Sequence, residues 1–316
     1  MNSDDNITAY NLRNPKSEMR ALLLLFTFLL LILPSFAQTI ETDDGLIHYE
    51  IEGSGIPILI INGGPGMSSE GFRSLSKTLS GNYRTILFDQ RGTGQSTLKT
   101  ISSETITMDN MVDDIERIRE HLGVQKWVVL GHSFGGILGS YYASKHPNKT
   151  LGLIYSSSGG LDMELLSSLD ITSRLSQTDR DSLQYWTRQI ASGDTSYQAR
   201  LNRGKYLAPA YLYDDSLILV IAERLTQGNM TINGLVFSDM RRINYDTKAE
   251  LENYTKPVLI IQGKYDIIPL SISQKAHQLF PNSTLLVLDQ ASHYGWLEEP
   301  EEYFSAIDVF MNSFEP

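Results

Sequence analysis

A serine stands between glycines at the centre of the chain. The segment Gly131-His132-Ser133-Phe134-Gly135 matches the pattern G-x-S-x-G. An apolar stretch that ends at Leu130 precedes it and a helix-like stretch follows. In this strand–turn–helix context the turn lifts the serine hydroxyl above the end of a sheet, where it can attack a carbonyl carbon. The pattern therefore predicts Ser133 as the nucleophile of an acyl-transfer reaction. The alternative is a glycine- and serine-containing turn without chemistry.

A serine needs a general base, and histidine is the usual one. His132 lies within the turn, where its ring cannot face the neighbouring hydroxyl. His293 lies in a loop directly after a predicted strand, and His277 lies on a predicted helix. In this class of site the base comes last in chain order, after the nucleophile and the acid. We therefore predict His293 as the base. The chain contains six histidines: His48, His121, His132, His146, His277 and His293.

The base in turn needs an acid to orient it. The predicted strand 257–263 is followed by Lys264-Tyr265-Asp266, between the nucleophile and the base in chain order. Asp266 would hold His293 in the productive tautomer and stabilise its cation. The alternative for Asp266 is a helix N-cap or a turn residue, because aspartate is common in both.

Two backbone amides must stabilise the oxyanion of such a reaction. One is the amide of Phe134, directly after the nucleophile. The other is predicted at Gly64, in the loop Asn62-Gly63-Gly64-Pro65-Gly66 that follows the strand 57–61. A phosphate-binding loop would also be rich in glycine. However, this loop carries no G-x-G-x-x-G pattern, no Gly-Lys-Ser/Thr and no basic residue.

Short apolar stretches alternate with helical patterns over most of the chain. They read as strands buried on both faces, which is typical of a parallel sheet. The first two expected strands flank Asp43-Asp44-Gly45 and form a hairpin. Helices are expected at 108–122, 135–145, 275–280 and 300–314, and strands at 38–42, 46–52, 57–61, 85–88, 127–130, 151–155, 257–262 and 284–288.

This alternation stops between residues 161 and 252, where the sequence is polar, rich in tyrosine and helix-like. The simplest arrangement is one α/β domain with a mostly parallel sheet, made of residues 38–160 and 253–316, with a helical cap inserted over 161–252.

The N-terminus carries a predicted export signal. Residues 21–33 form an unbroken apolar run, Pro34 ends it, and the small residues Ser35 and Ala37 fit cleavage before Gln38. Residues 1–37 are therefore expected to be a signal peptide, and the mature protein to be periplasmic or secreted without stable membrane association. An uncleaved anchor is the alternative. A start at Met19 would give a more positive flank than a start at Met1.

Composition excludes several classes of site. The 316 residues include no cysteine, which removes a thiol nucleophile, iron–sulfur clusters and cysteine-based zinc sites. The net charge of −11 argues against a nucleic-acid-binding surface. No histidine pair has metal-ligand spacing. No metal and no cofactor are expected, and oligomeric state is left open.

The residues resemble the α/β-hydrolase superfamily, and within it the proline iminopeptidase-like peptidases. Three stretches carry the resemblance: Asn62–Gly66, Asp89–Ser96 with the sequence DQRGTGQS, and Gly131–Gly136. The resemblance implies an eight-stranded sheet, a helical cap and hydrolysis through an acyl-enzyme. It further implies aminopeptidase activity on small N-terminal residues, often proline, or on amino-acid amides. The partner would be a small-molecule or short-peptide substrate.

The sequence also departs from the family pattern. Asn62 stands where the family usually has histidine, and Phe134 where it often has tryptophan. The family binds the substrate amine with cap glutamates, for which Glu223 is one possible match. An esterase or lactonase using the same triad is therefore a second expectation, favoured if the cap pocket is apolar. A non-catalytic binding protein on the same fold is a third. Arg91 is expected to tie loops together through carbonyls or Asp89.

Overall fold

The computed structural model describes residues 38–164 and 169–314. The predicted signal peptide, residues 1–37, lies outside this part of the chain. Among the described residues no helix has both the length and the apolar character that crossing a membrane requires.

A mostly parallel sheet forms the centre of the structure, as the sequence predicts. Its strand order is β1-β2-β4-β3-β6-β7-β8-β9. The pairs β1–β2 and β2–β4 are antiparallel and all later pairs in this order are parallel. A two-residue strand β5, which the sequence does not predict, pairs with β2. The strands are β1 (Gln38–Thr42), β2 (Gly45–Glu52), β3 (Pro57–Ile61), β4 (Arg84–Phe88), β5 (Thr97–Leu98), β6 (Trp127–His132), β7 (Thr150–Ser156), β8 (Val258–Gly263) and β9 (Ser283–Leu288).

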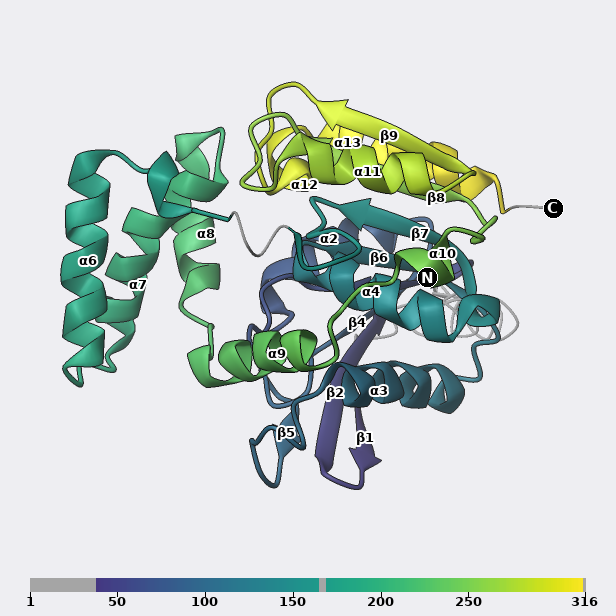
Figure 1. Ribbon diagram of the computed structural model, residues 1–316, viewed down its shortest axis with the longest axis horizontal. Helices are drawn as coiled ribbons and strands as arrows, with labels where there is room; N and C mark the ends of the chain where they lie inside the picture. The colour runs from purple at the N-terminus through teal and green to yellow at the C-terminus, as the bar shows by residue number, and fades with distance from the viewer. Residues whose placement is uncertain (1–37, 165–168, 315–316) are drawn as a thin grey trace, which may run out of the picture. The chain divides into compact units, whose positions relative to one another are not determined.

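The central strands of the sheet are buried on both faces, which explains why they read as continuous apolar stretches. In β3, Leu59 and Ile61 enter one hydrophobic cluster while Ile58 and Ile60 enter the other. The first cluster is covered by α3 (Met108–His121), α4 (Phe134–Lys145) and α11 (Leu270–Leu279), the second by α2 (Arg73–Leu79) and α13 (Pro300–Asn312) (Figure 1). The short helix α12 (Gly295–Glu298) precedes α13.

The chain between β7 and β8 is helical. Serines begin two of its helices, because the side chains of Ser176 and Ser196 accept hydrogen bonds from the amides of Asp179 and Ala199. Helix α7 packs between α6 and α8 (Figure 1). Helix α9 differs, because its Ile232 and Met240 belong to the first hydrophobic cluster of the sheet, which α3 also covers. The helices are η3 (Thr172–Arg174), α6 (Gln177–Ala191), α7 (Tyr197–Leu207), η4 (Ala208–Tyr211), η5 (Asp215–Leu217), α8 (Ile218–Leu225), α9 (Met230–Arg242) and α10 (Lys248–Leu251), and η1 (Glu70–Phe72) and η2 (Pro147–Lys149) lie earlier in the chain.

Candidate active site

The loops that follow four strands meet at one edge of the sheet. Because β3, β6, β8 and β9 run parallel, their carboxyl ends share that edge, which is where ligands bind in open α/β sheets. Gly64, Ser133 and His293 line one cavity there, with a volume of about 540 Å³. Three of the residues that the sequence singles out are thus brought together.

Ser133 sits in a strained turn between β6 and α4. Its backbone has φ 55° and ψ −119°, a conformation that L-residues rarely adopt and that costs of the order of 1–3 kcal/mol. The neighbouring glycines allow the turn. A Cβ on Gly131 would lie 2.4 Å from the carbonyl oxygen of Gly135, and one on Gly135 would lie 2.0 Å from that of Ile61. The glycines of the motif therefore satisfy a packing requirement.

His293 and Asp266 form a buried pair behind the cavity. Nδ1 of His293 lies 2.7 Å from Oδ1 of Asp266, and the two residues are 2% and 8% exposed. The amide of Ile268 donates to the same oxygen at 3.0 Å, so the carboxylate is fixed in place. The Asp266 carboxylate accepts a hydrogen bond from the N–H at Nδ1 of His293. The neutral imidazole therefore has no proton on Nε2, which can accept one.

The Ser133 hydroxyl makes no hydrogen bond to His293 within residues 38–164 and 169–314. Such contacts are often long without substrate and tighten in the substrate complex. His277, the other late histidine, contacts Ser283 at an exposed position through Nδ1 and does not line the cavity.

The loop 62–66 is held by side chains from its surroundings. Nδ2 of Asn62 donates to the carbonyls of Met67 at 3.0 Å and Ser68 at 3.3 Å, so the asparagine ties the loop to itself. Nε2 of Gln90 donates to the carbonyl of Asn62 at 2.9 Å. Gly64 has φ 72°, which favours glycine. Neither the Gly64 nor the Phe134 amide has an acceptor in the described chain, which leaves both available to a ligand.

Arg224, from α8, reaches the same loop. Its Nη2 donates to the Gly63 carbonyl at 2.9 Å and its Nη1 to the Tyr294 hydroxyl at 2.8 Å. The Gly63 oxygen and the Gly64 N–H belong to one trans peptide group and point in opposite directions. By fixing the oxygen, Arg224 fixes the direction of the N–H. Sequence reasoning missed this role, because the contact depends on how the helices pack on the sheet.

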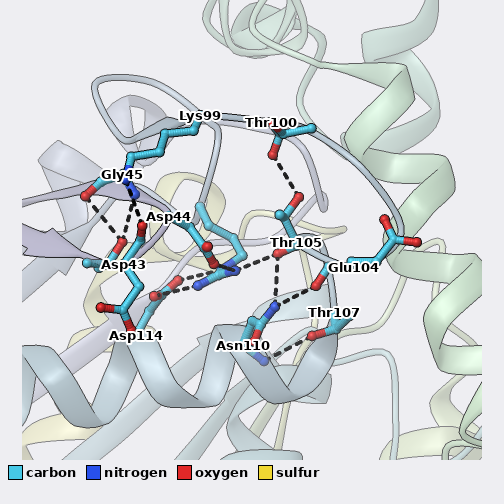
Figure 2. Close-up of polar contacts among 12 residues, drawn as sticks. Asp43, Asp44, Gly45, Lys99, Thr100, Glu104, Thr105, Thr107, Asn110 and Asp114 are labelled. Carbon is cyan, nitrogen blue, oxygen red and sulfur yellow. Dashed lines mark hydrogen bonds and ion pairs between the residues drawn. The ribbon is translucent and has the colours of Figure 1, made fainter.

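Arg91 has a structural role, as the sequence predicts, and it contacts a loop carbonyl and a carboxylate. The guanidinium forms a two-point ion pair with Asp114 of α3, with both distances 2.8 Å, and Nη1 donates to the Thr105 carbonyl at 2.5 Å. Figure 2 labels Asp114 and Thr105 in this network, together with Asp44, which lies 3.7 Å from Nη1 of Arg91. Of the two expected partners, carbonyls and Asp89, the first is confirmed by the Thr105 carbonyl, whereas the carboxylate partner is Asp114 in place of Asp89.

Asp89 instead accepts from the Ser69 amide at 2.8 Å and the Gln95 amide at 2.9 Å, and it lies 3.1 Å from Nδ1 of His48. The carboxylate thus binds the segment that follows the loop 62–66 and the turn in which Asp89 itself lies. The DQRGTGQS stretch therefore holds the loop 62–66 through Gln90 and the segment after it through Asp89.

His132 is buried beneath the site and packed among rings. The centroids of its ring and that of His293 are 4.6 Å apart, and Trp296 lies at 4.8 Å. Its Nε2 is buried and has no partner within the described residues. Burial, reinforced by the charges of His293 and Arg224, holds the pKa of His132 well below its usual value of 6.5. His132 therefore stays neutral in the folded protein.

This burial predicts a pH-dependent loss of stability. Above about pH 6.5 His132 is neutral in both the folded and the unfolded chain and contributes nothing to the pH dependence of the free energy of unfolding. Below this pH the unfolded chain binds a proton that the folded chain cannot bind. The free energy of unfolding should therefore fall by up to about 1.4 kcal/mol per pH unit from this group.

Urea unfolding of wild type and His132→Gln between pH 7.5 and 5 measures the effect. The variant should lose less stability per pH unit, whereas the exposed-site control His277→Gln should follow wild type. Equal slopes in wild type and His132→Gln would contradict the account.

The rest of the cavity is mostly apolar, and none of its described lining residues is acidic. The possible amine-binding residue Glu223 is exposed, accepts a hydrogen bond from the Tyr197 hydroxyl and does not line the cavity. Among the described lining residues, the permanently charged side chains are those of Arg203 and Arg224. The lining consists of Gly63, Gly64, Pro65, Met67, His132, Ser133, Leu169, Ile171, Thr172, Leu183, Thr187, Arg203, Leu207, Tyr211, Arg224, Leu225, Gly228, Asn229, Met230, Asn233, Phe237, Ile267, His293 and Tyr294.

Comparison with known families agrees with this architecture. Residues 56–300 match the family model described as alpha/beta hydrolase fold. The chain belongs to the α/β-hydrolase family. The fold that the sequence predicts is thereby confirmed.

Relatives of this α/β hydrolase include peptidases. The chain is 27% identical over 294 residues to the proline iminopeptidase of Saccharolobus solfataricus, covering 84% of this chain and 87% of the relative. It is also similar in fold to the proline iminopeptidase of Mycobacterium smegmatis, with TM-score 0.66, 23% identity and coverage of 88% and 98%. A thermophilic esterase from Thermogutta terrifontis is similar too, with TM-score 0.67, 20% identity and coverage of 88% and 99%. The resemblance to proline iminopeptidases is thus confirmed.

Proposed function

We propose that this α/β hydrolase is a serine hydrolase that cleaves small amides or esters through an acyl-enzyme. One observation carries the proposal. Ser133 and His293 line the same cavity, while Nδ1 of His293 lies 2.7 Å from the buried carboxylate of Asp266. This is the arrangement of nucleophile, base and orienting acid that acyl transfer requires.

In the proposed reaction Ser133 Oγ attacks the substrate carbonyl while its proton passes to Nε2 of His293. The oxyanion of the tetrahedral intermediate accepts from the amides of Gly64 and Phe134. Its collapse expels the amine or alcohol, which takes the proton from His293 and leaves an ester on Ser133. Water, deprotonated by the same imidazole, then attacks that ester. The acid is released and the serine hydroxyl is restored.

The relatives favour an aminopeptidase, whereas the residues that line the cavity favour an esterase or lactonase. Similarity to proline iminopeptidases supports an aminopeptidase acting on small N-terminal residues or amino-acid amides. An aminopeptidase must bind a protonated amine, and the described cavity lining offers it two arginines and no carboxylate. This charge pattern supports the second candidate, a carboxylesterase or lactonase using the same residues.

We also propose that the protein is exported after cleavage before Gln38, on the strength of the apolar run 21–33 and the small residues at Ser35 and Ala37. N-terminal sequencing of the protein from its own host tests this. A mature chain that begins upstream of residue 21 would contradict it.

The assay that tests the function compares L-prolyl and L-alanyl p-nitroanilide with p-nitrophenyl butyrate, using the chain from Gln38 onward. Hydrolysis of at least one class should depend on Ser133. Faster release from the anilides establishes the aminopeptidase, and cleavage of the ester alone establishes the esterase. No turnover of either class, with no reaction with a fluorophosphonate, would favour a binding protein on the same fold.

A further inference from the structure

The charged side chains in the described cavity lining are arginines, in a protein whose net charge is −11. Arg203 and Arg224 both line the cavity, and the described lining contains no aspartate or glutamate. The four residues between the described segments, 165–168, are Leu-Leu-Ser-Ser and add no acid. A substrate entering the cavity therefore meets guanidinium groups without a compensating carboxylate.

The two arginines differ in what they contact. Arg224 is committed to the Gly63 carbonyl and the Tyr294 hydroxyl. Arg203, on α7, makes no hydrogen bond and no ion pair within the chain that the structure describes. Its guanidinium is thus available to a ligand.

Burial places Arg203 in an unfavourable environment for its charge. It is half-buried, and desolvation lowers its pKa. The buried Arg91 and Arg119 have carboxylate partners, Asp114 and Glu116, and the buried Arg224 has a carbonyl and a hydroxyl partner. Removing a guanidinium from water without a partner costs stability, and a bound anion would remove that cost.

We infer that Arg203 binds a carboxylate carried by the substrate of this hydrolase. The inference rests on the proposed function and extends it to a substrate class: an ester or amide with a free carboxylate on its acyl or its leaving group. A planar guanidinium matches a carboxylate through two parallel hydrogen bonds. A dipeptide meets the requirement through its C-terminus, and a monoester of a dicarboxylic acid meets it through its acyl chain.

The test uses length-matched substrates that differ in one carboxylate. The adipate mono-4-nitrophenyl ester is compared with 4-nitrophenyl hexanoate for the acyl side. The esters 4-butyryloxy-3-nitrobenzoate and 2-nitrophenyl butyrate are compared for the leaving group. L-prolyl-L-alanine against L-prolyl-L-alaninamide covers the peptide case. For at least one pair kcat/KM should favour the carboxylate.

The variant Arg203→Gln should lower that ratio, carboxylate over neutral, by about 10- to 100-fold, the range of a hydrogen bond to a charged group. Arg203→Lys should retain part of it. Arg200→Gln is the matched control, because Arg200 lies on the same helix, is exposed and does not line the cavity. Its ratio should equal that of wild type.

The outcomes separate this inference from the proposed function. Ser133-dependent hydrolysis with no carboxylate preference in any pair, or a preference that Arg203→Gln leaves intact, overturns the role of Arg203 and leaves the serine hydrolase standing. Loss of the preference in Arg200→Gln as well would assign it to general surface charge and overturn the inference. Absence of Ser133-dependent turnover for every substrate would overturn the proposed function itself.

Discussion

Replacing Ser133 with alanine should lower kcat by about 10⁵- to 10⁶-fold for whichever substrate the enzyme turns over best. The expected loss is this large because nucleophile, base and acid act as a unit, and the rest of the site accelerates the reaction only modestly without them. KM should change little, since the hydroxyl contributes little to substrate binding. Steady-state kinetics on a preparation free of host hydrolases measures both quantities.

The strained backbone at Ser133 calls for a matched control. Ser157 also has a positive φ, 47°, so Ser157→Ala removes a hydroxyl from a similar conformation. Its amide donates to the Ile261 carbonyl, a contact that the substitution keeps. Ser157→Ala should stay within a few-fold of wild-type kcat. An equal loss in both variants would assign the effect to the fold and contradict the nucleophile assignment.

The second large effect is expected for Asp266→Asn, a kcat lower by about 10⁴-fold. The carboxylate now accepts from Nδ1 of His293 at 2.7 Å and leaves Nε2 unprotonated. An amide can present its N–H to Nδ1 instead, which moves the imidazole proton to Nε2. The imidazole then cannot accept the serine proton.

Shape and packing are nearly unchanged in Asp266→Asn, so the midpoint of urea unfolding should move little while kcat collapses. Oδ1 accepts from both the Ile268 N–H and Nδ1 of His293, so an amide N–H turned toward Nδ1 gives up the Ile268 hydrogen bond, a loss of about 1 kcal/mol. A kcat within tenfold of wild type would show that Asp266 has no part in orienting the base. A collapsed urea midpoint would make its role structural.

The parts of the site that local pattern specifies were predictable. A strand buried on both faces is a short apolar stretch, which can be identified in the sequence without knowing its neighbours in the sheet. All eight predicted strands occur in the sheet. The turn at Ser133 was predictable because a Cβ at Gly131 or Gly135 would lie less than 3 Å from backbone atoms. Few other sequences therefore fit this turn. Chain order then placed the acid and base after consecutive parallel strands.

Contacts that depend on packing between distant segments were not predictable. Arg224 lies 161 positions from the Gly63 carbonyl that it holds, and no periodicity reports such a pairing. Arg91 pairs with Asp114 rather than Asp89, because Asp89 is occupied by backbone amides. Strand β5 has two residues, too few to show any pattern. Helix α11 begins at Leu270, where the sequence predicted 275.

The glycine-rich loop illustrates both cases. The place of Gly64 in a cavity-lining loop was predictable, because the loop follows a buried strand. The geometry around it was not, because Gln90, Asn62 and Arg224 converge on the loop from three different parts of the chain.

The most direct test of the account is covalent labelling of the chain with a fluorophosphonate, followed by intact mass measurement and peptide mapping. The account predicts one adduct per chain, on Ser133, absent from Ser133→Ala and slowed in Asp266→Asn. The adduct should form in Ser157→Ala at the wild-type rate. An unlabelled wild-type chain, or an adduct on a different serine that persists in Ser133→Ala, would contradict the claim that Ser133 is the nucleophile of a serine hydrolase.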